Sequence, residues 1–278
     1  MPFPVYIPFF PDAEPHRLLS REAEPTDETT YLEQPAQMIS APVFARALPR
    51  HGLVVDAGCG GGRWTHFAVQ HGCHVVAVDC YQPVLRQVHV RVPTAKLVAA
   101  EASDLPFRDG SLSGAISLGV VEHDPNGPGK MLAEIGRVLE PGGILLVSVP
   151  FNNFLRRVFF NPLYRRYNNR WAGRGHYFVE YRFSAAELRQ ALQAQGFTVE
   201  RFVPHEFFPP RNMGLVSDRN LLSVRFVPNE HGGWSLSLPP HRGWEIEKRW
   251  QPLLRTLWKL SPWLVCGEIL AVARKRTV

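Results

Sequence analysis

Residues 53–64 read Leu-Val-Val-Asp-Ala-Gly-Cys-Gly-Gly-Gly-Arg-Trp, and this stretch decides the fold. Its first three residues are apolar, as expected of a parallel strand that is covered on both faces. Asp56 ends the strand, and four of the next six residues are glycine. Glycines allow a tight turn and a close approach of the backbone to a ligand. Apolar residues then recur at helical spacing up to Gly72, so the stretch predicts a strand, a ligand-binding turn and a helix.

Two common phosphate-binding patterns do not fit this turn. Counting from Gly58, the sixth position of a G-x-G-x-x-G dinucleotide fingerprint is Arg63 instead of glycine. No lysine follows the glycines, as the loop G-x-x-x-x-G-K-[ST] requires. Asp56, two residues before the first glycine, suits a ligand that carries cationic groups. A nicotinamide-dependent dehydrogenase is therefore disfavoured.

The segment Asp56-Ala57-Gly58-Cys59-Gly60 resembles motif I of the class I S-adenosylmethionine (SAM)-dependent methyltransferases. SAM carries a sulfonium and an α-ammonium group and no phosphate. The resemblance implies an α/β fold: a seven-stranded, mostly parallel Rossmann-like sheet flanked by helices, with an antiparallel last strand and, in this chain, two insertions. It also implies that these five residues bind SAM.

Two later segments extend the resemblance. The second expected strand ends in Asp79, where the family has its ribose-binding acid, and Cys80 follows it. A carboxylate at this place can accept hydrogen bonds from both ribose hydroxyls, although it also suits a cap of the next helix. Glu101, Ala102 and Ser103 begin a segment similar to the family's acid-Ala-x-x-Leu-Pro-Phe, whose turn covers adenine. Glu101 stands where the family more often has aspartate.

The fourth strand is expected over residues 115–123 and runs out to the methyl-transfer edge. Leu118 and Gly119 are expected beside the cofactor. His123 is a candidate general base, because histidine is the side chain that titrates near neutrality. Many members of the family carry a similar Glu-His pair for packing and cofactor orientation, so both roles are open for His123.

Periodicity and end signals predict the remaining core elements. Ser184 and Glu187 have the spacing of a capping box at the start of a helix. Pro141-Gly142-Gly143 is expected to end another helix. The elements so expected are helices over 38–48, 131–139 and 184–196 and strands over 96–100, 144–149, 197–203 and 266–275.

The expected organisation is an N-terminal arm, 1–34, and a methyltransferase domain, 35–278, with insertions at 151–182 and 205–262. The arm is rich in proline and acidic residues. Family members often use such an arm to cover the active-site mouth, which makes Tyr31 a candidate contact.

The first insertion, 151–182, holds seven arginines against one acid, Glu180, interleaved with aromatic residues. Four interpretations are open. The first is an aromatic lid over a hydrophobic or acidic substrate, and the second is a surface for anionic lipid head groups. The third is a nucleic-acid surface, and the fourth is a helical cap whose aromatic side chains pack inward. The lid is favoured, and nucleic acid is not expected as a partner.

The second insertion, 205–262, contains two Pro-Pro pairs and one Gly-Gly pair, so much of it is expected to be loop. Pro252 can open a helix there. Its apolar stripe is expected to pack in the core, with a membrane-surface or dimer contact as the alternative. The stripe comprises Leu253, Leu254, Leu257, Trp258 and Leu260.

Composition sets the cellular context. The chain has 278 residues and a net charge of +6, which is basic but far from the composition of a protein that coats nucleic acid. Its four cysteines have neither C-x-x-C nor metal-ligand spacing, so no metal site is expected. The start lacks a secretory pattern. The longest apolar run, 263–273, is too short to span a bilayer and contains Glu268, so a cytoplasmic protein is expected.

These patterns together predict methyl transfer from SAM to a small-molecule acceptor, most readily an oxygen of a hydrophobic or acidic metabolite. A SAM-fold protein without catalysis and an RNA methyltransferase are the alternatives. The Asn/Asp-Pro-Pro-Tyr signature of amino-methylating nucleic-acid enzymes is missing from residues 118–121. The oligomeric state and the roles of the two insertions are left open.

Overall fold

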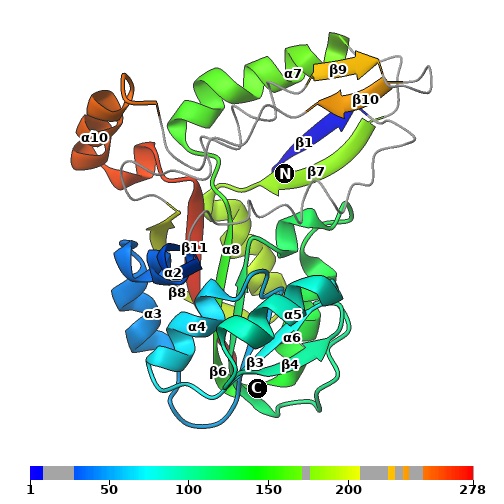
Figure 1. Ribbon diagram of the computed structural model, residues 1–278, viewed down its shortest axis with the longest axis vertical. Coiled ribbons are helices and arrows are strands. Elements are labelled where there is room, and N and C mark those ends of the chain that lie inside the picture. The colour runs from blue at the N-terminus through cyan, green and yellow to red at the C-terminus, as the bar shows by residue number, and fades with distance from the viewer. Residues whose placement is uncertain (9–27, 171–175, 207–224, 229–233, 238–246, 278) are drawn as a thin grey trace.

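The computed structural model describes residues 1–8, 28–170, 176–206, 225–228, 234–237 and 247–277. Figure 1 shows two parts. A sheet with helices on both sides forms the lower part, and α7, β1 and β7 lie together at the upper end.

A seven-stranded sheet is the centre of the fold. Its strand order is β4-β3-β2-β5-β6-β11-β8. Six strands are parallel, and β11 is antiparallel to both of its neighbours. The predicted fold class, with an antiparallel last strand, is therefore confirmed. The strands are β2 (Val54–Ala57), β3 (Val75–Asp79), β4 (Lys96–Ala99), β5 (Leu112–Leu118), β6 (Leu139–Pro150), β8 (Phe197–His205) and β11 (Glu268–Lys275).

Helices cover both faces of the sheet. On one face lie α6 (Gly129–Val138) and α8 (Ala185–Ala194). On the other lie α3 (Ala41–Ala47), α4 (Arg63–Gln70) and α5 (Gln82–Arg91). Because neighbouring side chains of a strand point to opposite faces, a strand covered on both sides must be apolar throughout. The central strands have this composition, which is why the apolar runs could be recognised in the sequence.

Strand β6 shows how both faces are buried. Leu145, Val147 and Val149 pack toward α6 and α8, whereas Ile144 and Leu146 pack toward α3 and α4. All five are at most 6% exposed. Full burial of each such side chain contributes about 1.5–3 kcal/mol. The core therefore holds the sheet rigidly and fixes where its strand ends lie.

The first insertion and the start of the chain fold together. Strand β1 (Phe3–Pro8) pairs antiparallel with β7 (His176–Arg182). Helix α7 (Asn161–Arg170) follows a π-helical turn, η3 (Arg156–Phe160), and packs on this ribbon through Val5, Tyr164 and Val179. The N-terminal arm thus contributes a strand, which its proline-rich composition did not indicate.

Only part of the second insertion is described. Strands β9 (Arg225–Pro228) and β10 (Trp234–Ser237) pair antiparallel, and α10 (Gln251–Leu260) has Pro252 in its first turn as expected. The expected core stripe of α10 is wrong in part. Leu254 is buried, but Leu253 and Leu260 are exposed, because the contacts of α10 with the other described residues are made by the side that carries Leu254. The Pro-Pro and Gly-Gly pairs lie outside the described residues.

Several expected element boundaries differ from the structure, and two of these differences bear on the site or on the packing of α6. The fourth strand does not reach His123: β5 ends at Leu118, because Gly119 has a φ of +68° and breaks the extended backbone. Residues Val121–His123 form a 3-10 turn, η2. Helix α6 ends at Val138, before Pro141, and β6 begins at Leu139 with extended backbone. The capping box of Ser184 and Glu187 is present.

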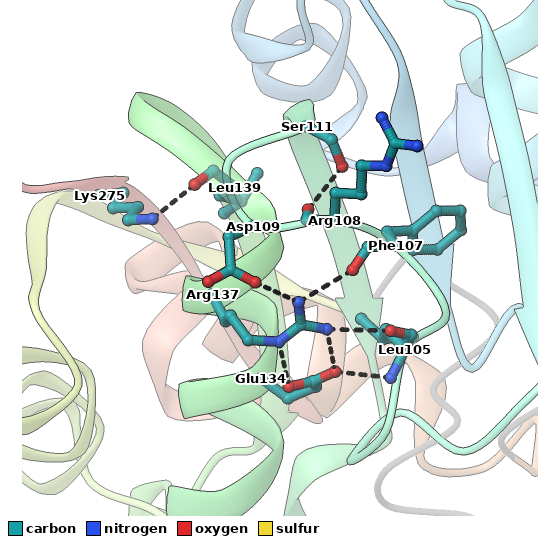
Figure 2. A network of polar contacts seen from close by, with 9 residues as sticks. All are labelled: Leu105, Phe107, Arg108, Asp109, Ser111, Glu134, Arg137, Leu139 and Lys275. Atoms are coloured by element: carbon teal, nitrogen blue, oxygen red, sulfur yellow. Dashed lines mark hydrogen bonds and ion pairs between the residues drawn. The ribbon is translucent and has the colours of Figure 1, made fainter.

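One arginine connects α6 to the loop after β4 (Figure 2). The Arg137 guanidinium donates to the carbonyl oxygens of Phe107 and Leu105, at 2.9 and 3.0 Å. It also donates to the carboxylates of Asp109 and Glu134. Glu134 in turn accepts from the Leu105 amide at 2.7 Å. The network fixes the segment that resembles the family's adenine-covering turn.

Replacing Arg137 by alanine should loosen this loop. Two backbone carbonyls and Glu134 lose a charged donor, so we expect the free energy of unfolding to fall by about 1–2 kcal/mol, measured by urea denaturation. Arg108 lies in the same loop and is exposed, and its guanidinium points away from the network in Figure 2. Arg108→Ala is therefore the matched control and should change stability little. Equal effects of the two substitutions would contradict the anchoring role of Arg137.

Candidate functional site

The glycine turn lies at the carboxyl edge of the sheet, between β2 and α4. Gly58, Gly60 and Gly62 have φ values of +83°, +50° and +84°, which L-residues with side chains rarely adopt. The amides of Gly58 and Cys59 both donate to the Val78 carbonyl, at 2.8 and 2.9 Å. The turn is thus tied to the end of β3, the strand that carries Asp79.

Space around the turn also requires glycine. A methyl group on the Cα of Gly58 would lie 2.4 Å from Cγ2 of Val120, in the segment after β5. A methyl group on Gly62 would lie 2.9 Å from Cγ2 of Val88 on α5. Because both distances are shorter than the contacts that real Cβ atoms make, the turn packs directly against its neighbours. The ends of β2, β3 and β5 are therefore brought together at one edge.

Asp79 lies beside the glycine turn. Its Oδ2 accepts from the Gly60 amide at 3.1 Å, and its Oδ1 accepts from the Tyr81 amide at 2.9 Å. The N-terminal cap of α5 is Tyr81, so Asp79 precedes the cap and is not the capping residue. Its carboxylate is half-buried. A carboxylate at the end of the second parallel strand can accept hydrogen bonds from a ligand's hydroxyls.

The other residues of the segment Asp56–Gly60 that were predicted to bind SAM are buried behind the turn. Asp56 is 3% exposed, and its Oδ2 accepts from the Thr65 hydroxyl at 2.5 Å, which connects β2 to α4. Ala57 and Cys59 are buried. Cys80 is exposed, and partial removal from water, with the nearby Glu101 and Asp79 carboxylates, raises the pKa of its thiol.

The turn after β4 lies next to Asp79. The amide of Ala100 donates to the Asp79 carbonyl at 3.2 Å. Glu101 is exposed, Ala102 is buried and Ser103 is half-buried. These residues, predicted to lie near adenine, are thus on the same edge as the glycine turn.

His123 is held by the first insertion. Its Nδ1 lies 2.7 Å from the Val179 carbonyl oxygen of β7, so Nδ1 carries the proton that is donated. In the neutral ring the lone pair is then on Nε2. The Tyr181 hydroxyl donates to the Pro125 carbonyl at 2.9 Å, a second contact between β7 and the segment after β5. The first insertion therefore contacts the segment after β5, which also packs against Gly58 of the glycine turn.

The N-terminal arm approaches the glycine turn from another side. Helix α2 (Glu28–Glu33) packs on α4, and Tyr31 is buried with the guanidinium of Arg91 over its ring, 5.2 Å from the centroid. Arg91 also donates to the Gly61 carbonyl at 3.1 Å. Tyr31, the candidate contact over the mouth, is thus connected to the turn through Arg91.

The structure adds polar residues that were not recognised in the sequence. Arg63, the first residue of α4, donates to Gln34 at 3.2 Å and pairs with Glu206 at 2.6 Å. Glu206 is 3% exposed and has a φ of +53°, a strained conformation for a residue with a side chain. The neighbouring His205 contacts the Ser40 hydroxyl at 2.7 Å through Nδ1. Burial, with a smaller effect of the Arg63 guanidinium, lowers the pKa of His205 to about 3.

Two further acids lie at the ends of the central strands. Glu268, the first residue of β11, accepts from the Ser148 hydroxyl of β6 at 2.5 Å. Glu122, in η2, is 1% exposed. Removal from water raises the pKa of Glu268 to about 8 and that of Glu122 well above its ordinary value. An acid within an otherwise apolar run was the signal for Glu268 in the sequence.

The arginines of the first insertion have two different roles. Arg156 and Arg182 are buried and hold the backbone and side chains of the insertion together. Arg156 donates to the carbonyls of Phe151 and Gly267, and Arg182 pairs with Glu180. These two arginines are therefore part of the interior of the insertion and cannot bind an external anion. The arginines at 157, 165 and 166 are exposed.

Two absences concern only the part of the chain that the structure describes. Within it, no group of three or more His, Cys, Asp or Glu side chains could hold a metal ion. Over the same residues, none of the helices is both long and apolar enough for a membrane span.

Comparison with known proteins agrees with this geometry. Residues 55–147 match the methyltransferase domain family. The chain contains a class I SAM-dependent methyltransferase domain. The match covers the glycine turn, Asp79, the turn after β4 and the sheet up to Val147.

Individual relatives share this domain. A tRNA (carboxymethyluridine(34)-5-O)-methyltransferase of Arabidopsis thaliana is 26% identical over 58% of this chain and 39% of its own length. A Mycolicibacterium smegmatis protein named "Probable S-adenosylmethionine-dependent methyltransferase" is 29% identical over 53% of this chain and 52% of its own. This chain therefore spans about half or less of the length of these relatives.

A solved structure shares the fold over nearly the whole length of this chain. The Burkholderia thailandensis 1,6-didemethyltoxoflavin-N1-methyltransferase, solved with S-adenosylhomocysteine bound, has a TM-score of 0.51 at 20% identity. The likeness covers 99% of this chain and 96% of that one. At this identity the likeness concerns the fold alone.

Asp79→Ala should weaken the binding of S-adenosylhomocysteine to the methyltransferase domain. If the carboxylate binds the ribose, the loss of its hydrogen bonds raises the Kd by about tenfold or more, measured by calorimetric titration. Glu140→Ala, which removes an acid near the opposite end of β6, is the control. Binding of the Asp79→Ala protein with the wild-type Kd would exclude the ribose role.

Proposed function

We propose that this protein transfers a methyl group from SAM to a small-molecule acceptor. The observation that carries the proposal is the edge where Gly58, Gly60 and Asp79 meet: a glycine turn with left-handed backbone beside a carboxylate. This arrangement suits an adenosyl ligand without phosphate, because neither a third fingerprint glycine nor a phosphate-binding lysine is present in the turn.

The proposed cofactor residues fall into three groups. Residues 56–60 form the glycine turn that binds the cofactor, which we call the cofactor cradle. Within it, Asp56, Ala57 and Cys59 are buried and hold the turn in place. Asp79 and Cys80 lie at the ribose, and Glu101, Ala102 and Ser103 lie at the adenine. Leu118 and Gly119 lie at the methionine end, where the methyl group leaves.

The sulfonium makes the methyl group of SAM electrophilic without help from the protein. What the chain supplies is alignment of the nucleophile with the methyl group and exclusion of water. Contacts of β7 with His123 and with Pro125 support a role of the first insertion in covering this edge. His123 remains a candidate base, because its Nδ1–H contact leaves the lone pair of the neutral ring on Nε2.

The acceptor expected from the sequence is an oxygen of a hydrophobic or acidic metabolite. An acidic metabolite fits poorly, because Glu122 and Glu268 already place two carboxyl groups beside Gly119. A SAM-fold protein without catalysis is also disfavoured, since the turn and both strand-end acids are intact.

Gly58→Ala tests the cofactor cradle. The added methyl group collides with Val120, so we expect calorimetric titration to show at least about tenfold weaker binding of SAM and S-adenosylhomocysteine. Gly72→Ala is the matched control: Gly72 has a φ of +82°, as Gly58 has +83°, but nothing lies within 4 Å of the added group. The wild-type protein should bind both adenosyl ligands and not NADH. Binding of NADH alone would contradict the proposal.

We also propose that residues 154–166 contact an anionic membrane surface. Four apolar side chains of this segment are 46–57% exposed. They are Phe154, which precedes η3, Val158 and Phe159 in η3, and Leu163 in α7. The arginines at 157, 165 and 166 are exposed on the same segment, and no acid occurs between 151 and 179. Basic and exposed apolar side chains combined in one helical segment suit anionic head groups.

The double substitution Phe154→Ser and Phe159→Ser tests this contact. We expect wild-type protein to sediment with phosphatidylserine vesicles more than with phosphatidylcholine vesicles, and the variant to lose most of that binding. Ile39→Ser with Val90→Ser, which also removes two exposed apolar side chains, is the control. Binding to RNA with no preference for anionic vesicles would favour the RNA acceptor instead.

A further inference from the structure

Two carboxyl groups flank Gly119, at the end of β5. A methyl group on the Cα of Gly119 would lie 3.7 Å from Oε1 of Glu122 and 3.8 Å from Oε1 of Glu268. The two acids come from η2 and β11, which are far apart in the sequence. Both therefore reach the same point, which is the methionine end of the proposed cofactor site.

Glu122 provides an independent sign of a ligand. Its side chain is 1% exposed, and its Oε2 has no hydrogen-bond partner among the described residues. A buried carboxyl oxygen without a partner lowers the stability of the fold, because it loses its hydrogen bonds to water and gains none within the protein. Glu268, by contrast, has the Ser148 hydroxyl. Ser148 thus anchors Glu268, whereas one of the two carboxyl oxygens of Glu122 has no partner among the described residues.

The charges around this pair are mostly acidic. The carboxylates of Glu206 and Glu122 raise the pKa of Glu268, and the carboxylate of Glu180 on β7 raises the pKa of Glu122. Among the described residues, Arg63 pairs with Glu206 at 2.6 Å, and Arg182 pairs with Glu180 at 3.1 Å. His205 is neutral, since burial lowers its pKa. A positively charged group entering beside Gly119 would therefore meet the two acids that have no arginine partner among the described residues, Glu122 of η2 and Glu268 of β11.

We propose that Glu122 and Glu268 bind an amine, which is the methyl acceptor. The proposal rests on the methyl transfer proposed above and narrows the acceptor to a nitrogen that arrives as an ammonium ion. Ser148 positions the Glu268 carboxyl group, and Gly119 leaves room between the two acids. This replaces the oxygen acceptor that the sequence favoured.

The chemical step balances with these groups. One carboxylate takes a proton from the ammonium, which leaves a neutral amine and a carboxylic acid. The nitrogen lone pair then forms the N–CH3 bond while the C–S bond breaks and its electron pair returns to sulfur. The products are a methylammonium ion and S-adenosylhomocysteine, and the carboxylic acid loses its proton to water.

The pH dependence follows from the direction of the pKa shifts. Burial and neighbouring acids raise the pKa of Glu268 to about 8, so this carboxyl group is largely protonated below that pH, and burial also raises the pKa of Glu122. A cation is bound more tightly when Glu268 is deprotonated, so its affinity should rise as the pH rises from about 6 to 8, where an alkylammonium is still charged.

The test compares two probes of the same shape on protein loaded with S-adenosylhomocysteine. Phenethylamine is cationic and 2-phenylethanol is neutral. We expect calorimetry at about pH 8 to show phenethylamine binding at least about tenfold more tightly than the alcohol. Glu268→Gln and Glu122→Gln should each remove this preference. Glu200→Gln, an exposed acid on β8, is the matched control and should keep it.

Each outcome decides the proposal. Equal binding of the two probes, no binding of either, or a preference that survives both glutamine substitutions would overturn it. The proposal also fails if Glu268→Gln weakens the binding of S-adenosylhomocysteine and leaves the amine preference, because the pair would then serve the cofactor. Failure of wild-type protein to bind S-adenosylhomocysteine would instead contradict the proposed function.

Discussion

The left-handed backbone of the glycine turn is the constraint on which the site depends. Gly58 has no room for a side chain, because Val120 packs directly against it. The Gly58 amide donates a hydrogen bond to the Val78 carbonyl near the end of β3. The turn therefore joins β2, β3 and the segment after β5 at one edge. Asp79, Gly119 and the turn after β4 are brought together as a consequence, although they come from separate parts of the chain.

Beside the glycine turn and the strand ends that it joins, the chain has features that we propose select the methyl acceptor. The first insertion pairs with the start of the chain and contacts η2 through His123. The last strand, which is antiparallel, carries Glu268 to the same edge as the parallel strand ends. In the proposed function, the parallel half of the sheet places the methyl donor, and β11, η2 and the insertion shape the acceptor end.

The sequence predicted the part of the fold that is specified locally. Apolar strands covered on both faces, the glycine turn and the capping box of Ser184 can each be recognised from neighbouring residues. The β1–β7 pairing could not, because it joins residues about 170 positions apart. Nor could the approach of Glu122 to Glu268, which depends on the order of strands in the sheet. The burial of the α10 stripe was predicted wrongly in part, because periodicity identifies a helix but not what covers its apolar side.

A crystal structure of the protein with S-adenosylhomocysteine bound tests the central claim most directly. We predict that both ribose hydroxyls lie within about 3 Å of the Asp79 carboxylate and that the sulfur lies beside Gly119, facing Glu122 and Glu268. A ligand bound elsewhere, or one whose ribose makes no contact with Asp79, would contradict this prediction.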